Sequence, residues 1–163
     1  MTRFVPYFVC ATLTVSLAGV AYADANSSAK SAIQTAYNKM NAAFGRKDPG
    51  GYFAYVVSNG QFVDKSGRVQ TAAAYQGWMK NNAPHLSSIS VNTKVTGADV
   101  KGGDATVSAN ERKELTATTP RGSFDVVYVT TYRDTWVKNG SRWQLKKSQA
   151  LTQKQSVNGS PLR

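Results

Sequence analysis

The segment Tyr128-Val-Thr-Thr-Tyr-Arg-Asp-Thr-Trp-Val-Lys-Asn-Gly-Ser-Arg-Trp-Gln-Leu-Lys-Lys-Ser-Gln149 decides the fold of this chain. It reads as two alternating strands joined at Asn139-Gly140, a dipeptide that accepts positive φ at both central positions of a type I′ turn. With these two residues as the loop, Lys138 faces Ser141 and every later cross-strand pair follows. The stretch therefore predicts a long antiparallel hairpin with a defined register.

This register sorts the side chains of the hairpin onto two faces. The bulkier face, which we expect on the core side, holds Trp136 opposite Trp143, Asp134 opposite Leu145, Tyr132 opposite Lys147, and Thr130 opposite Gln149. Asp134 and Lys147 then lie within diagonal reach of each other. One interpretation of this pair is a salt bridge at the rim of the sheet, and the other is the polar end of an apolar pocket.

The preceding strand carries a second carboxylate in an unexpected place. Ala105, Val107 and Ala109 form its smaller, apolar side, and continuing that side reaches Glu111. In one interpretation Glu111 is a buried base whose pKa is raised by desolvation. In the other, which we favour, a bulge or a sheet edge turns Glu111 toward solvent.

Helices precede the strands along the chain. Apolar residues at three- and four-residue steps predict a helix over 27–44, Asp48-Pro49 predicts a short helix over 48–55, and Thr71 caps a helix that ends near residue 82. Alternation predicts strands over 62–64, 88–100, 105–118, 123–138 and 142–152. This order predicts an α+β fold in which the N-terminal helices pack on a strongly curved antiparallel sheet.

The first 23 residues have the features of a secretory signal peptide. Arg3 precedes a mostly apolar run that ends at Val20, and Ala21-Tyr22-Ala23 matches a small-x-small cleavage site. A membrane anchor is the alternative, but the run is marginal for a span. We therefore expect an exported protein, periplasmic or extracellular, with no stable membrane span after cleavage. Residues 24–153 form one domain and 154–163 a flexible tail.

Composition excludes several classes of function. The net charge is +11, but the basic residues are scattered, so we expect a solvated basic surface and no specific nucleic-acid partner. Cys10 is the only cysteine and lies in the predicted signal peptide. His85 is the only histidine, so no metal site is expected. No phosphate-binding or dinucleotide motif is present, and we expect no cofactor.

The predicted order of elements resembles the nuclear transport factor 2-like superfamily, whose cone fold includes ketosteroid isomerase, scytalone dehydratase and SnoaL-like domains of unknown function. Ala32-Ile33, Ala36-Tyr37 and Met40 resemble its first helix, Asp64-Lys-Ser-Gly67 its acidic-glycine turn, and the segment from Asp134 to Gln149 its closing hairpin. The resemblance covers about residues 27–152. It implies a pocket between the first helices and the concave sheet.

The resemblance also implies which residues line this pocket. They are Tyr37, Phe53, Tyr75, Trp78, Tyr128, Tyr132 and Glu111, and the hairpin register adds Lys147 and Gln149 as ligand-binding candidates. Simple core packing is the alternative for the aromatic set. The acid and tyrosine set of the isomerases does not map onto this chain residue by residue, and one histidine cannot supply the paired histidines of the dehydratases.

Three functional hypotheses remain open. The leading one is a non-catalytic exported domain that binds a small, mostly apolar ligand, with an anionic group near Lys147. The second is an isomerase, dehydratase or cyclase with Glu111 or Asp134 as base and Tyr132 or Tyr128 as hydrogen-bond donor. The third is an assembly domain that forms a homodimer through the outer sheet face, where the sequence places Val127, Val129 and Val137.

Overall fold

The computed structural model describes residues 18–120 and 122–162, with side chains from residue 24 onward. Within these residues the helices are α1 (Ala18–Gly45), α2 (Pro49–Phe53) and α3 (Ala72–Asn82), followed by a single 3₁₀ turn, η1 (Ala83–His85). The strands are β1 (Val56–Val63), β2 (Val69–Thr71), β3 (Leu86–Lys101), β4 (Asp104–Thr119), β5 (Gly122–Asn139), β6 (Arg142–Val157) and β7 (Ser160–Pro161). Helices thus come first and long strands follow, as predicted.

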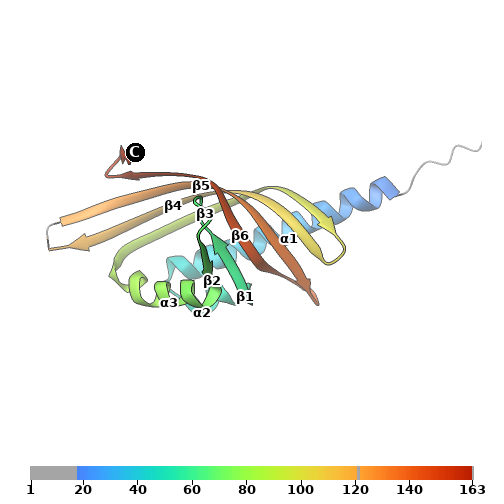
Figure 1. Cartoon of the computed structure of the whole chain (residues 1–163), viewed down its shortest axis with the longest axis horizontal. Helices are drawn as coiled ribbons and strands as arrows, with labels where there is room; N and C mark the ends of the chain where they lie inside the picture. Colours follow the sequence, from blue (N-terminus) through green and yellow to red (C-terminus); the bar gives the residue numbers. More distant parts are fainter. Residues whose placement is uncertain (1–17, 121, 163) are drawn as a thin grey trace, which may run out of the picture.

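The strands form one curled sheet, and the helices lie on one side of it (Figure 1). The strand order is β2-β1-β6-β5-β4-β3, with β7 paired to β6. All neighbours are antiparallel except β1 and β6, which run parallel. The sheet is therefore mixed, whereas the sequence predicted a purely antiparallel one. The order still confirms the predicted α+β architecture.

Local capping explains where the short helices begin. The Asp48 carboxylate accepts a hydrogen bond from the Gly51 amide, and Pro49 occupies the first turn of α2. The Thr71 hydroxyl accepts from the Ala74 amide at the start of α3. Both caps satisfy amides that lack a partner within the helix. The two predicted starts are confirmed.

The core lies between α1 and the concave side of the sheet. Ile33 and Met40 of α1 are fully buried, and so are Val107 of β4 and Trp136 of β5. The buried row of β4 consists of the small residues Ala105, Val107 and Ala109. Their size lets the helix approach the sheet closely, which places the Tyr37 ring 5.0 Å from the Trp136 ring, edge to face.

Both ends of the described chain lie in regular secondary structure, α1 at the start and β6 and β7 at the end. The predicted signal peptide lies mostly outside the described residues, and the backbone of 18–23 continues α1. No helix in the described part of the chain is long and apolar enough to cross a membrane. At the other end, the segment expected to be a loose tail is paired: residues 154–157 continue β6 opposite β5, and β7 folds back onto β6.

The β5–β6 hairpin exists, but its predicted register is wrong. Asn139 pairs with Arg142, so the loop residues are Gly140 and Ser141 rather than Asn139 and Gly140. Of these two loop residues, only Gly140 has a positive φ, at 60°. A glycine at the first central position fits a type II′ turn instead of type I′. The shift brings Trp136 opposite Leu145, so the two tryptophans are buried on one face without being direct partners.

Two bulges in β6 then change which residues face the core. The register shifts between Trp136–Leu145 and Thr135–Lys147, and again between Tyr132–Ala150 and Thr131–Thr152. Each bulge inserts one residue, and one residue moves the following side chains to the opposite face. The buried row of β6 therefore passes from Trp143 and Leu145 to Ser148 and Ala150.

Candidate functional site

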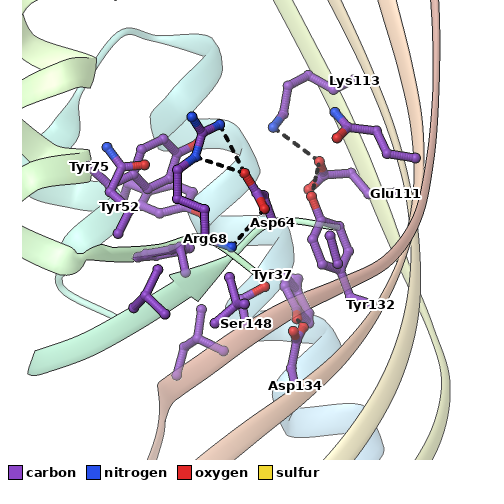
Figure 2. Close-up of a pocket in the computed structure, with 17 residues that line it drawn as sticks. Tyr37, Tyr52, Asp64, Arg68, Tyr75, Glu111, Lys113, Tyr132, Asp134 and Ser148 are labelled. Atoms are coloured by element: carbon purple, nitrogen blue, oxygen red, sulfur yellow. Dashed lines mark hydrogen bonds and ion pairs between the residues drawn. The ribbon is translucent and has the colours of Figure 1, made fainter. Parts of the chain in front are cut away.

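A cavity of about 580 Å³ lies between the helices and the concave side of the sheet (Figure 2). Side chains of α1, α2 and α3 form one wall, and β4, β5 and β6 form the other. The loop between β1 and β2, from Asp64 to Arg68, contributes to a third side. The lining residues are Tyr37, Tyr52, Phe62, Val63, Asp64, Arg68, Val69, Gln70, Tyr75, Glu111, Lys113, Tyr132, Asp134, Leu145, Ser148, Ala150 and Gln153.

Asp134 occupies a buried position beneath this cavity, and its side chain is 1% exposed. It accepts hydrogen bonds from the Tyr37 hydroxyl and from the Gln149 amide, the latter over 3.3 Å. The Ser148 hydroxyl also stabilises its charged form. None of the ion pairs found among the described residues includes Asp134. The carboxyl is therefore held by neutral donors alone.

This environment shifts the acid–base properties of both partners. Burial raises the pKa of Asp134 to about 7, and the hydrogen bonds from Tyr37, Ser148 and Gln149 offset only part of that effect. Burial and the adjacent carboxylate also raise the pKa of Tyr37 well above its usual value, so Tyr37 remains a donor. Asp134 consequently titrates close to neutral pH, where a general base is most useful.

A second carboxylate, Glu111, sits among charged and hydroxyl donors. Lys113 follows it by two residues on β4, so both side chains project from the same face of the strand. The Lys113 Nζ lies 3.1 Å from Glu111 Oε1, and the two side chains are 19% and 13% exposed. The Tyr132 hydroxyl donates to the same oxygen over 3.3 Å. Figure 2 shows this group on the sheet side of the cavity.

A short hydrogen-bond relay holds Glu111 from behind. The Asn41 Nδ2 of α1 donates to the Thr93 Oγ1 of β3 over 3.1 Å, and Thr93 Oγ1 lies 3.3 Å from Glu111 Oε2. Both Asn41 and Thr93 are buried. A hydroxyl has one proton, so accepting from Asn41 leaves Thr93 free to donate to the carboxylate. Glu111 thereby receives donors at both oxygens.

The lysine of this pair remains charged despite its burial. Desolvation alone would lower the pKa of Lys113, but the attraction of the Glu111 carboxylate outweighs it, and the pKa is raised well above the usual value. The ammonium also lies 5.6 Å above the ring of Phe44, a favourable cation–π arrangement. Lys113 is therefore a fixed positive donor on the cavity wall.

Aromatic side chains from the helical layer and β1 form the apolar wall. The Phe62 and Tyr75 rings meet edge to face at 4.7 Å, and Tyr52 and Tyr75 at 6.1 Å. Burial raises the pKa of Tyr52 and of Tyr75, so neither ionises near neutral pH. Phe53 packs behind Phe62 and Tyr75 without lining the cavity.

The turn between β1 and β2 contributes an ion pair. The Arg68 guanidinium lies 2.9 Å from the Asp64 carboxylate, which also accepts from the amide and the hydroxyl of Ser66. These hydrogen bonds, first of all that from the Ser66 hydroxyl, lower the pKa of Asp64 to about 2. Gly67 adopts a φ of 86°, a value that suits glycine in this tight turn.

The structure brings together some of the predicted site residues and separates others. All three predicted catalytic candidates, Glu111, Asp134 and Tyr132, line the cavity, and so do Tyr37 and Tyr75. The residues predicted to bind ligand that do not line it are Phe53, Trp78, Tyr128, Lys147 and Gln149. The prediction that favoured a solvent-facing Glu111 is wrong, because no bulge interrupts β4 opposite β5 at that position.

The misplaced residues have identifiable causes. Lys147 and Gln149 follow the first β6 bulge, so Thr135 and Arg133 are their partners on β5, and the predicted Asp134–Lys147 pair does not form. Trp78 is 40% exposed on α3 and stacks on the outside of Tyr75. The Tyr128 hydroxyl accepts from Gln155. The backbone amide of Gln149 donates a hydrogen bond to Asp134, although the Gln149 side chain does not line the cavity.

Sequence reasoning also overlooked residues that the cavity includes. Lys113 had a usable signal, because it follows Glu111 at the strand period of two. Ser148 had none, since the bulge that turns it inward leaves no mark in the sequence. Tyr52 and Arg68 come from a short helix and a turn, where alternation gives no direction. His85 lies in η1 and does not line the cavity.

Within residues 18–120 and 122–162, no group of three or more His, Cys, Asp or Glu side chains is arranged to hold a metal ion. The chemistry that the arrangement supports is proton transfer. A carboxylate that titrates near neutral pH lies on one side of the cavity, and a lysine and a tyrosine that donate hydrogen bonds lie on another. Such a pair of environments suits removal of a proton and stabilisation of the resulting oxyanion.

No family model matches the sequence, and no curated protein matches it at a significant level. Solved structures do resemble it. A candidate scytalone dehydratase from Novosphingobium aromaticivorans DSM 12444 aligns with a TM-score of 0.71 and 17% identity, over 86% of this chain and 93% of that one. The type 3 hexachlorocyclohexane dehydrochlorinase LinA from Novosphingobium barchaimii LL02 gives 0.59 and 12%, over 83% and 90%.

A protein of unknown function from Mycobacterium tuberculosis aligns with a TM-score of 0.61 and 16% identity, over 84% of this chain and 76% of that one. At identities this low, structural likeness establishes a fold and no activity. The matches extend over the helices and the curled sheet alike, which agrees with the resemblance drawn from the sequence. The chain has the cone-shaped α+β fold of the nuclear transport factor 2-like superfamily.

Proposed function

We propose that this protein is a lyase or isomerase that acts on a small, mostly apolar molecule by removing a proton from carbon. The observation that carries the proposal is Asp134: a buried carboxyl that faces a cavity of about 580 Å³ and has no cationic partner among the residues that the structure describes. Its pKa of about 7 leaves part of the population ionised at neutral pH. A structural carboxylate more often has a charged partner.

The roles of the remaining residues follow from their positions. Asp134 accepts the proton, and the electron pair of the broken C–H bond moves into an enolate or expels a leaving group. The Lys113 ammonium, which has three N–H groups, donates to the oxygen that gains charge. Tyr132 donates to the same oxygen once its hydroxyl turns away from Glu111. Glu111 keeps both donors in place. Tyr37 holds Asp134, and the captured proton returns either to the substrate or to the departing group.

The names of two structural neighbours are consistent with this class of reaction. A dehydratase and a dehydrochlorinase both remove a small molecule from a substrate, and each aligns with this chain over most of its length. The likeness supports the reaction class only as an analogy of fold.

The test is proton exchange in heavy water, followed by mass spectrometry of a panel of small cyclic ketones and β-hydroxy ketones. If the protein removes a proton and returns a deuteron, the compound gains one mass unit. If it catalyses elimination, the compound loses the mass of one water molecule. Asp134→Asn should lower the rate by a factor on the order of 10³. The matched control is Asp125→Asn, the same change at an exposed position of the same strand. If compounds bind and none changes mass, the catalytic proposal is wrong.

The second candidate is a non-catalytic protein that binds a ligand in the same cavity. It is favoured by the three donors already held by Asp134, which could satisfy a purely structural carboxyl. Heavy-water exchange separates the two candidates, because a binding protein would retain compounds without changing their mass. Native mass spectrometry of protein purified from its own compartment would identify a retained molecule.

Export and self-association are proposals that the fold leaves open. For export, the mature N-terminus should be Asp24 and the protein should fractionate outside the cytoplasm; an intact N-terminus in the cytoplasm would contradict this. For self-association, Val129 on the outer sheet face is 43% exposed and could contribute to a dimer contact. Light scattering of the wild type and of Val129→Lys would detect a dimer and its loss.

A further inference from the structure

We propose that the molecule bound in this cavity is uncharged and contains a ring, although the protein as a whole is strongly basic. The inference rests on the proposed function, because it assumes that the cavity binds a ligand. The inference goes beyond the proposed function by naming the charge and shape of that ligand. The net charge of the chain, +11, would by itself suggest an anionic one.

Each cation on the cavity wall is paired with a carboxylate instead. Among the lining residues in the described part of the chain, the cations are Arg68 and Lys113 and the carboxylates are Asp64, Glu111 and Asp134. Arg68 lies 2.9 Å from Asp64, and Lys113 lies 3.1 Å from Glu111. Each cation is therefore already paired, and the third carboxylate has no cation beside it.

An anionic ligand gains little from such a wall. To reach Lys113 it must compete with Glu111 in a site where both side chains are mostly buried, and it leaves a carboxylate unpaired if it succeeds. At Arg68 it meets Asp64, which the Ser66 turn keeps in place. Asp134 adds repulsion whenever it is ionised. Its raised pKa shows that the surroundings already disfavour an isolated charge there.

The apolar part of the wall indicates the shape of the ligand. Phe62 and Tyr75 meet edge to face, and Tyr52 contacts Tyr75 in the same way, so their rings form a continuous aromatic surface. Such a surface packs well against a flat or compact ring. Across the cavity, the Lys113 ammonium supplies N–H donors for an oxygen atom (Figure 2). A neutral ring that carries a carbonyl or hydroxyl group satisfies both sides.

The test compares two naphthalene competitors of similar size, one neutral and one anionic. Protein at about pH 7 and about 0.15 M salt is loaded with the neutral fluorophore N-phenyl-1-naphthylamine. The fluorophore is then displaced with 2-naphthalenemethanol or with 2-naphthoate, which share a ring system. We expect the neutral alcohol to displace the fluorophore at a concentration about tenfold lower than the carboxylate, a ratio that one unfavourable charge interaction readily supplies.

Variants that leave one cation unpaired should weaken this preference. Glu111→Gln frees Lys113, and Asp64→Asn frees Arg68 in the turn between β1 and β2. Each should improve displacement by 2-naphthoate by about fivefold and change that by the alcohol less than twofold. Glu114→Gln is the matched control: it makes the same change on β4 but pairs with Arg112 and does not line the cavity. It should alter neither competitor.

The outcomes separate this inference from the proposed function. If the fluorophore binds and the carboxylate competes as well as the alcohol, the cavity binds ligands but the charge inference is wrong. If neither cavity variant improves displacement by 2-naphthoate, the balance of the two pairs does not set the preference, and the inference is again wrong. If the fluorophore and both competitors fail to bind, the cavity is not a binding site and both proposals fall.

Discussion

Asp134 and Glu111 are two carboxyl groups in one cavity, yet their surroundings give them different properties. Asp134 has only neutral donors and is buried, so its pKa rises to about 7. Glu111 has Lys113 beside it, together with two hydroxyl donors. For these two carboxyl groups, the charge of the nearest partner matters more than the position in the sheet. It also assigns the roles: Asp134 is suited to exchange a proton, and Glu111 to hold other groups in place.

The largest expected effect is on the pH dependence of stability. The folded-state pKa of Asp134, about 7, lies above the ordinary value of 3.8, so the folded protein holds a proton that the unfolded chain releases. The protonated Asp134 carboxyl makes its full contribution to the free energy of unfolding below about pH 4, and this contribution is lost as the pH rises through about 7. At about 1.4 kcal/mol per pKa unit, the loss is on the order of 4 kcal/mol.

Urea unfolding of the wild type and Asp134→Asn across this interval measures the effect. Asparagine cannot ionise, so the variant should lack the decline seen in the wild type between these two pH values. Asp125→Asn, on the same strand at an exposed position, should retain it. The difference in unfolding free energy between the wild type and Asp134→Asn should therefore change with pH. If it does not, Asp134 is not the group whose pKa is raised.

Breaking the Glu111–Lys113 ion pair should leave an unpaired charge inside the cavity. Lys113→Met leaves Glu111 without its cation, and we expect a loss of stability of about 2–3 kcal/mol, since the pair is mostly but not fully buried. The double variant with Glu111→Gln should recover part of that loss. A double-mutant cycle of unfolding free energies gives the coupling. Additive effects of the two changes would mean that the ion pair contributes nothing.

The hydrogen bond to Asp134 offers a smaller and more specific test. Tyr37→Phe removes the hydroxyl that favours the ionised carboxylate, so the pKa of Asp134 should rise further, by about one unit. Carbon NMR of labelled aspartate would report the shift directly. With a substrate in hand, the acidic limb of the pH–rate profile should move to higher pH by the same amount. A downward shift would show that Tyr37 does not donate to Asp134.

The smallest effect is expected from the relay behind Glu111. Thr93→Val keeps the shape of the side chain but removes the hydroxyl between Asn41 and the carboxylate. We expect a loss of about 1–2 kcal/mol of stability and a lower rate at unchanged KM, because only the placement of Glu111 changes. Thr93→Ser should restore both. A Thr93→Val protein with wild-type stability would show that the relay has no energetic role.

The predictable part of the site follows from periodicity. Glu111 and Tyr132 lie on strands whose alternation is regular, so their direction could be deduced, and Tyr37 shares the apolar face of a helix. Lys113 was within reach of the same reasoning. Lys147 and Gln149 could not be placed, because the bulge before them depends on how β5, β6 and β1 pair together. A local pattern cannot reveal a bulge of that kind.

The sequence by itself determined the order of elements, both short-helix caps, the α+β class and the rows of β4 and β5 that face inward. Each of these depends on neighbours within a few residues. The tertiary structure alone decided the parallel pairing of β1 with β6, the bulge that turns Ser148 toward Asp134, and the pairing of each cation on the cavity wall with a carboxylate. Those features arise from contacts between distant segments, and a contact of that kind leaves no periodic trace in the chain.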